Sequence, residues 1–254
     1  MSTNRRIGTG LATVVSFAGL AVAAARAQAP LYPGHTIQTP NGHTSGDFVA
    51  LDLNGDSIVD FASAHGNFYN LTTMLSNGAG GFATSEIPLP ALSSALLAGD
   101  LNGDGAKDLV CVYQVIGQSG VETFLQTPSG FAPGPVVPAG SVACTGALLD
   151  VNGDGALDAA ISNLWSSNVG IYFGDGLGNL ALASNVATGS FPSSLALGDL
   201  NGDGAPDLVT SNNGSSDLTV ALNLGGGAMG VGSSTPAGGP DNASLALEDV
   251  DHDG

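Results

Sequence analysis

Residues 199–207 read Asp-Leu-Asn-Gly-Asp-Gly-Ala-Pro-Asp, and a short apolar run stands on each side of this nonapeptide. Aspartate or asparagine occupies positions 1, 3, 5 and 9, and glycine occupies positions 4 and 6. Glycine adopts backbone with positive φ at no steric cost, so the segment predicts a tight loop between two strands. Alternate residues of an extended segment point the same way. The side-chain oxygens of positions 1, 3 and 5 are therefore expected on one side of the loop.

The same loop recurs along the chain at a regular interval. Complete copies occupy residues 52–60, 100–108 and 150–158, and a fifth copy at 249–254 has only its first six positions. The first aspartates, at positions 52, 100, 150, 199 and 249, are 48, 50, 49 and 50 residues apart. An internal period of roughly 20 to 50 residues is typical of solenoids and propellers.

Strand-length stretches surround each copy. Around the third copy they are residues 147–149, 159–161, 169–173 and, more weakly, 180–186, with a glycine-rich turn before the last. Three or four short antiparallel strands in about 49 residues are typical of a propeller blade, which buries its faces only against neighbouring blades. We therefore predict an all-β fold, a β-propeller with four complete repeats and a truncated fifth. An extended β-solenoid is the alternative, but its coils are usually shorter.

The loops have the composition of a site for a hard cation. Oxygens from positions 1, 3, 5 and 9 and a backbone carbonyl at position 7 form the kind of ligand set that calcium binds at about 2.3–2.6 Å. Magnesium demands stricter octahedral geometry, and zinc prefers nitrogen or sulfur. An EF-hand would need glutamate at position 12, where the chain has Ser63, Cys111, Ile161 and Thr210. The candidate ligands, in loop order, are Asp52, Asn54, Asp56, Ile58 and Asp60; Asp100, Asn102, Asp104, Ala106 and Asp108; Asp150, Asn152, Asp154, Ala156 and Asp158; Asp199, Asn201, Asp203, Ala205 and Asp207; and Asp249, Asp251 and Asp253.

The charge of the chain favours a cation site over plain acidic turns. The chain has 22 acidic residues against 4 Lys and Arg, and 15 of the acids lie in the five loops. Repeated clusters of three carboxylates would repel one another without a cation, so we expect up to four complete structural calcium sites. Ser57 replaces the glycine at position 6 of the first loop, which predicts that loop to be the weakest complete site. A chain so poor in basic residues cannot displace the counterions of nucleic acid, which excludes nucleic acid as a partner.

The amino terminus has the features of a secretory signal peptide. Arg5 and Arg6 precede an apolar run and a small-residue pattern that ends at Ala27, so we place the cleavage there. The run is shorter than the roughly 20 residues of a membrane span, so we expect export, extracellular or periplasmic, without membrane insertion. The domains are then a signal peptide at 1–27, a lead-in segment at 28–45 and repeats at 46–254. Cleavage leaves Lys107 against 22 acids, a net charge of −21.

The repeated phrase, as in residues 197–209, resembles the FG-GAP/VCBS repeats and is similar to the calcium-bearing blades of integrin α-subunit propellers. The resemblance covers residues 46–254. It implies a calcium-stabilised propeller with the ion in the hairpin loop between the first two strands of each blade. The sequence departs from the family at Ser57, in the fifth loop and in lacking a clean FG…GAP phrase. Family propellers commonly have six or seven blades, whereas 227 residues hold about 4.6 such units, which indicates a fragment or an incomplete ring.

Motifs for catalysis are absent from the linear sequence. The four histidines, His35, His43, His65 and His252, show no regular spacing, and there is no G-x-S-x-G nucleophile elbow. Cys111 and Cys144 lack the spacing of a zinc site and can form one disulfide at most. We therefore expect a secreted calcium-binding module that presents a binding or adhesion surface to an extracellular protein or glycan. The alternative is the scaffold or substrate-holding part of an extracellular carbohydrate-active enzyme of lyase or dehydratase type, because a site assembled across blades would escape a linear search.

Overall fold

The computed structural model describes residues 45–65, 69–114, 119–237, 245 and 247. Sixteen strands in this part of the chain form four four-stranded sheets, and within each sheet neighbouring strands are consecutive in the chain and antiparallel. The predicted signal peptide, nearly all of the lead-in segment and the fifth loop lie outside the described residues. Within the described residues there is no helix, and hence none that is long and apolar enough to cross a membrane.

The four sheets have the same order. The first contains β1 (Ser45–Leu51), β2 (Asp60–His65), β3 (Asn70–Ser76) and β4 (Phe82–Pro88). The second contains β5 (Ser93–Gly99), β6 (Asp108–Tyr113), β7 (Gly120–Thr127) and β8 (Gly130–Pro138). The third contains β9 (Ala143–Leu149), β10 (Asp158–Asn163), β11 (Asn168–Gly174) and β12 (Leu180–Ala187). The fourth contains β13 (Pro192–Gly198), β14 (Asp207–Asn212), β15 (Asp217–Ala221) and β16 (Ser233–Pro236).

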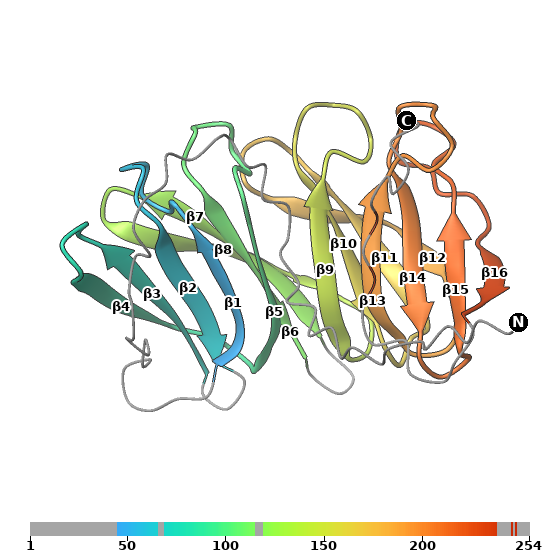
Figure 1. The fold of residues 1–254 in the computed structure, drawn as a ribbon, viewed down its shortest axis with the longest axis horizontal. Coiled ribbons are helices and arrows are strands. Elements are labelled where there is room, and N and C mark those ends of the chain that lie inside the picture. Colours follow the sequence, from blue (N-terminus) through green and yellow to red (C-terminus); the bar gives the residue numbers. More distant parts are fainter. Residues whose placement is uncertain (1–44, 66–68, 115–118, 238–244, 246, 248–254) are drawn as a thin grey trace, which may run out of the picture.

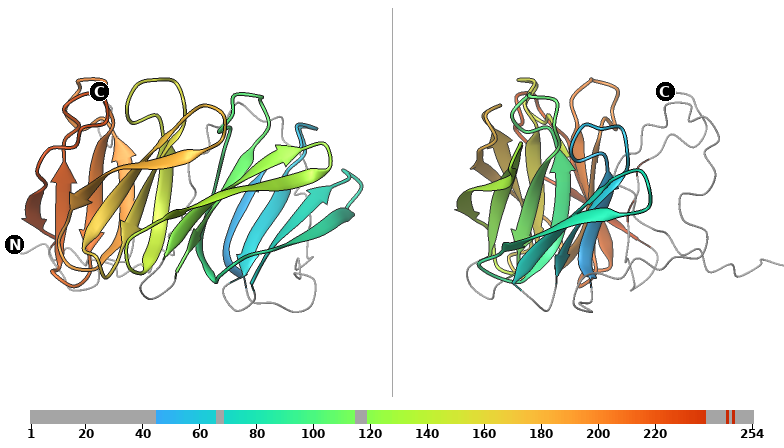
Figure 2. Two further views of the ribbon diagram at one scale, coloured as in Figure 1. Left: turned by 180° about the vertical axis from the view of Figure 1, so that it is seen from behind. Right: turned by 90° about the vertical axis from the view of Figure 1, so that its left-hand side faces the viewer.

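The sheets lie side by side in chain order, as Figures 1 and 2 show from three directions. Each sheet is one blade of a propeller-like array, and the described residues leave the ring unclosed. The predicted all-β fold and its repeat unit are confirmed, with four strands in each blade.

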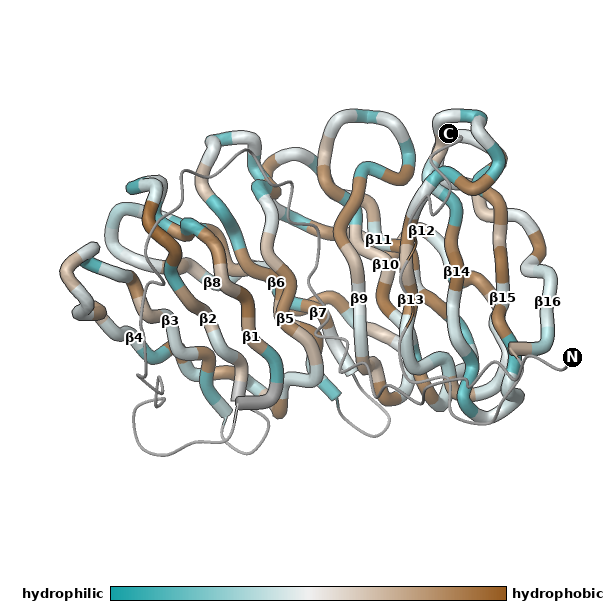
Figure 3. Tube along the Cα trace, in the orientation of Figure 1, coloured by the Kyte–Doolittle hydropathy of each residue, from teal (hydrophilic) through white to brown (hydrophobic). Residues whose placement is uncertain are grey.

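Burial between neighbouring blades explains why the second strand of a blade is so apolar. Every residue of β6 is buried, and the same holds for β10 and β14. Successive side chains of a strand point to opposite faces. Leu109 and Cys111 accordingly pack in a cluster with the first blade, whereas Val110 and Val112 pack in a cluster with the third. Figure 3 shows apolar residues along the strands of all four sheets.

Hydrogen bonds between successive blades recur at equivalent positions. The Ser94 hydroxyl donates to the Ala143 carbonyl at 2.8 Å, and one blade later the Cys144 thiol donates to the Pro192 carbonyl at 3.4 Å. The first strand of each blade is thereby tied to the first strand of the next.

A second recurring bond reaches the fifth repeat. The Leu96 N–H donates to Asp47 at 3.0 Å, and the Leu245 N–H donates in the same way to the Ser194 hydroxyl at 3.1 Å. Leu245 therefore occupies the place against the fourth blade that Leu96 occupies against the first.

Candidate metal centres

Each acidic loop connects the first strand of a blade to the second. Residues 52–59 join β1 to β2, and the three equivalent loops join β5 to β6, β9 to β10 and β13 to β14. All four loops lie at the upper edge of the array in Figure 1. The predicted location in the hairpin between the first two strands is confirmed for the four complete copies, and Asp249, Asp251 and Asp253 lie outside the described residues.

The backbone of the loops turns through left-handed conformations at positions 4 and 6. Gly153 and Gly155 have φ of 80° and 90°, and the glycines of the second and fourth loops are similar. In the first loop Ser57 has φ of 68°, a region that non-glycine residues adopt only at a cost. The four loops therefore share one backbone path, and the first loop follows it under strain.

The aspartate at position 1 organises this path. In the third loop, the Asp150 carboxylate accepts the N–H of Gly153 at 2.7 Å and the N–H of Gly155 at 2.9 Å. Asp52, Asp100 and Asp199 accept the same pair of bonds in their loops. In the fourth loop these backbone donors, led by Gly204, hold the pKa of Asp199 below its ordinary value. The charged carboxylate is thus favoured at this position.

Positions 3 and 5 lie against each other on the exposed side of the loop. The Asn152 side-chain carbonyl accepts the Asp154 N–H at 2.8 Å, and the Asn152 amide donates to the Asp154 carboxylate at 2.8 Å. The other Asp154 oxygen accepts the N–H of Ala156 at 2.8 Å. The other three loops repeat these bonds. The loop thus places oxygen atoms of positions 1, 3 and 5 around the same short stretch of backbone.

The aspartate at position 9 has a role that the sequence analysis missed. Asp158 is fully buried, and its two oxygens accept the N–H of Val151 at 2.8 Å and the N–H of Gly174 at 2.8 Å. Asp60, Asp108 and Asp207 bind the loop and the end of the third strand in the same manner. The position-9 carboxylate therefore braces three segments of its own blade. The signal for this role was its place at the start of an apolar strand, where a lone carboxylate needs backbone donors.

Burial raises the pKa of two of these carboxylates. Desolvation raises the pKa of Asp108 and of Asp158 above the ordinary value, and the backbone donors partly oppose the rise. A nearby positive charge would lower the pKa of these carboxylates, as the backbone donors do. After Arg26 the sequence contains one Lys or Arg, Lys107, so such a charge has few sources within the chain.

The donor chemistry of the loops fits a calcium ion, but the side chains do not form a closed cage. Across the described residues, no group of three or more His, Cys, Asp or Glu side chains is close enough to hold a metal ion. The side chains of positions 1, 3 and 5 are partly or fully exposed, whereas position 9 is buried. At positions 1 and 9 both carboxylate oxygens accept backbone N–H bonds, and each carboxylate keeps lone-pair capacity beyond these bonds for an ion.

The two cysteines are free thiols. Cys111 is buried against the first blade, and Cys144 contacts the Ser162 hydroxyl at 3.1 Å. Burial raises the pKa of both thiols, so both are neutral. The disulfide that the sequence allowed is not formed.

Comparison with known proteins identifies the repeats. The family model described as FG-GAP-like repeat matches residues 52–111, 150–210 and 199–254. No curated protein matches the chain in sequence.

Solved structures share the fold at low identity. A functionally unknown protein from Desulfotomaculum acetoxidans has a TM-score of 0.59 at 10% identity, over 77% of this chain and 57% of that one. An Agrocybe aegerita lectin that recognises non-reducing terminal N-acetylglucosamine has a TM-score of 0.50 at 22% identity, over 76% and 54%. BBS1N, solved in complex with ARL6DN, has a TM-score of 0.52 at 16% identity, over 79% and 57%. The chain thus spans a little over half the length of these structures.

Proposed function

The chain belongs to the family of FG-GAP-like repeat proteins, and from that premise we propose that it is a calcium-braced propeller module that binds a protein or glycan partner outside the cell. In this proposal calcium is structural and occupies up to four loops. The ligands are the oxygens of positions 1, 3, 5 and 9 and the carbonyl of position 7. The partner binds to the rigid surface that the braced blades present.

The observation that carries the calcium part is the identical loop in four successive blades. Asp150, Asn152 and Asp154 are held on one backbone path whose turns need positive φ, and three other loops repeat it. An acidic surface turn needs no such repetition. Four divalent ions would change the net charge after signal cleavage from −21 to −13, which relieves the repulsion between carboxylates.

Binding of calcium would also explain how each loop is kept in place. An ion held by positions 1, 3 and 5 would be fixed to the blade through Asp158 or its equivalent, which already bonds to the loop and to the third strand. Bound calcium supplies positive charge at these oxygens. The blade would then resist separation of its first hairpin from its third strand.

The binding role rests on the fold class and on the absence of a catalytic motif in the sequence. Propellers support both binding and catalysis, so the fold alone does not choose between them. The lectin with the same fold recognises a sugar, which fits a binding module in general terms.

The test is a calorimetric calcium titration of the chelator-stripped chain without residues 1–27, with thermal melts in parallel. We expect three to four sites with Kd at or below about a millimolar and a melting temperature that rises with calcium. Magnesium at the same concentration is the matched control and should give a smaller rise. If neither heat nor a shift in melting accompanies calcium, the loops are acidic turns and the proposal fails.

A further inference from the structure

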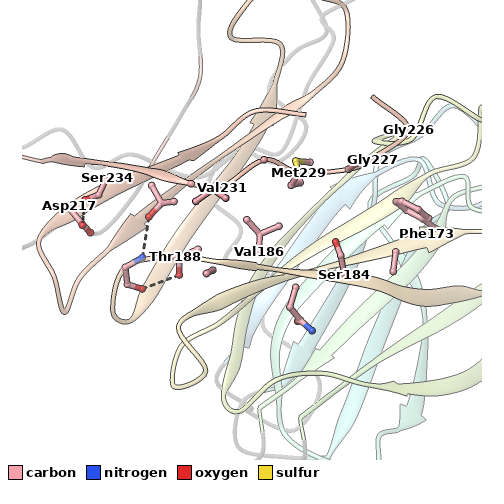
Figure 4. A pocket seen from close by; sticks show the side chains of 18 residues that line it. Phe173, Ser184, Val186, Thr188, Asp217, Gly226, Gly227, Met229, Val231 and Ser234 are labelled. Carbon is pink, nitrogen blue, oxygen red and sulfur yellow. Dashed lines mark hydrogen bonds between the residues drawn. The ribbon is translucent and has the colours of Figure 1, made fainter. Parts of the chain in front are cut away.

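A groove runs between the outer strand of the third blade and the last segment of the fourth, and one end of it lies beside the third acidic loop. Its volume is about 760 Å³. One wall consists of residues 183–189, and the other consists mainly of residues 226–232. Figure 4 shows Phe173 at one end, Asp217 with Ser234 at the other, and Val186, Met229 and Val231 between them.

An extended connection in the fourth blade builds this groove. The third and fourth strands are joined by residues 77–81, 128–129 and 175–179 in the first three blades, but by residues 222–232 in the fourth. β16 pairs only with residues 217–220 of β15, so the chain leaves the blade edge early. Three consecutive glycines, 225–227, take positive φ within this connection.

The base of the connection is firmly anchored. Asn223 is buried, its amide donates to the Val151 carbonyl of the third blade at 2.8 Å, and its N–H donates to Asp207 at 2.8 Å. The wall of the groove that residues 226–232 form is therefore held in a fixed place against the third blade.

The middle of the groove is apolar and partly open to water. Val186 is buried, Met229 is half-buried and Val231 is fully exposed. A β-branched apolar side chain presented to water beside other apolar groups is a surface that a ligand can cover favourably.

The wall formed by the third blade presents a backbone edge. The groove is lined by seven consecutive residues, 183–189, and therefore runs along β12 and not over one of its faces. β12 is the outermost strand of its sheet, so one side of its backbone lacks a neighbouring strand. An extended peptide is the ligand class that pairs with such an edge.

The polar end of the groove carries a negative charge held by neutral donors. The Asp217 carboxylate accepts the Ser215 hydroxyl at 2.6 Å, the Asn212 amide at 2.9 Å and the Ser234 hydroxyl. These donors, Ser215 above all, keep the pKa of Asp217 below its ordinary value. Among the described residues the one Lys or Arg is Lys107, in the loop between β5 and β6, so we expect a partner to supply the cation that Asp217 would bind.

We propose that this groove binds an extended segment of a partner protein, with a lysine ammonium at Asp217 and apolar side chains along Val186, Met229 and Val231. The inference rests on the proposed function in that it takes the partner to be a protein. No acidic loop contacts the peptide in this proposal, although Asn223 ties the groove wall to Val151 and Asp207 of two such loops.

The test uses methionine methyl groups as reporters. After removal of residues 1–27 the chain keeps two methionines, Met229 in the groove and Met74, which is buried in the first blade. A chain labelled with ¹³C at the methionine methyls is titrated with capped valyl-lysyl-valine and with the same peptide carrying norleucine for lysine. We expect the lysine peptide to shift Met229 and not Met74, with an affinity at least roughly tenfold higher than that of the norleucine peptide, as for one hydrogen bond to a charged group.

Variants locate the interaction. Asp217→Asn should bring the two peptides to within about twofold of each other, because the charge-assisted bond is lost. Val231→Ser should weaken both peptides alike, and it leaves folding intact since the side chain is exposed. Leu177→Ser, at an exposed position in the loop between β11 and β12, is the matched control and should change neither affinity.

The inference is overturned if neither peptide moves Met229 at millimolar concentration, if both peptides bind the parent chain equally, or if a neutral sugar such as N-acetylglucosamine shifts Met229 at lower concentration than the lysine peptide. Calcium binding is measured on the same sample. A chain that binds calcium but no peptide refutes the groove alone, and a chain that binds peptide but no calcium refutes the calcium loops alone.

Discussion

Replacement of Ser57 by glycine should stabilise the protein and strengthen its first loop. Ser57 has φ of 68° at a position where the other three loops have glycine. A left-handed conformation costs a non-glycine residue about 1–2 kcal/mol, and glycine costs about 0.5–1 kcal/mol through the entropy of the unfolded chain. The difference predicts a gain of about 0.5–1 kcal/mol in the free energy of unfolding for Ser57→Gly.

The structure shows why Ser57→Gly should change the free energy of unfolding through backbone strain and not through lost contacts. The Ser57 contact in the loop is its backbone N–H, which donates to Asp52 at 2.7 Å and is kept by glycine. A Cβ at Gly105, Gly155 or Gly204 meets no atom within 4 Å, so these positions differ in backbone strain and not in packing. The reverse change Gly155→Ser should therefore cost about as much as Ser57→Gly gains.

Urea unfolding of the chelator-treated chain measures both changes, and a calcium titration measures the effect on the loop. We expect Ser57→Gly to raise the denaturation midpoint without changing the slope, and to tighten the weakest of the calcium sites. The reasoning is refuted if Ser57→Gly lowers the midpoint while Gly155→Ser leaves it unchanged. Backbone strain at position 6 would then not contribute to the free energy of unfolding.

Two further predictions concern buried polar groups. Asp158→Asn should cost about 3 kcal/mol, because asparagine has one oxygen for the three backbone donors that the carboxylate satisfies, whereas the exposed control Asp154→Asn should cost less than about 1 kcal/mol; equal effects in urea unfolding would contradict the bracing role. Burial raises the pKa of Tyr172 to about 12, and its hydroxyl donates to the Pro138 carbonyl at 3.1 Å, so the neutral phenol contributes stability that is complete below pH of about 10 and is lost as the pH rises from about 10 to 12. Tyr172→Phe should flatten this alkaline loss by up to about 1.4 kcal/mol per pH unit, and an unchanged slope would show that Tyr172 does not titrate in the folded state.

The repeat made much of the fold predictable from the sequence. The last strand of the third blade, Leu180–Ala187, is one residue longer than the predicted stretch 180–186, and every complete loop lies between the first two strands of its blade. These features depend on local alternation and on turn residues, which a sequence displays directly. Four copies in phase also let each blade support the interpretation of the others.

Features that depend on contacts between distant residues were not predictable. Position 9 was expected to be a metal ligand, and the sequence did not show that its oxygens also accept backbone N–H groups up to 16 residues away. Asn223 bonds to a residue 72 positions earlier, and this contact helps to build the groove. The sequence shows only a glycine-rich stretch there. Nothing in the local sequence indicates which blade this stretch contacts.

The bonds from each blade to the next have a consequence for how such a chain can change over evolutionary time. Asp47 and Ser194 make the same bond to the following repeat although their side chains differ. The hydrogen bond at such a junction needs only a short polar side chain and the backbone of the following repeat, so many repeats can supply it. Duplication or loss of one whole 49-residue unit would therefore keep this hydrogen bond at every remaining junction. Gene segments of this length are accordingly the units that we expect to be gained or lost in the array.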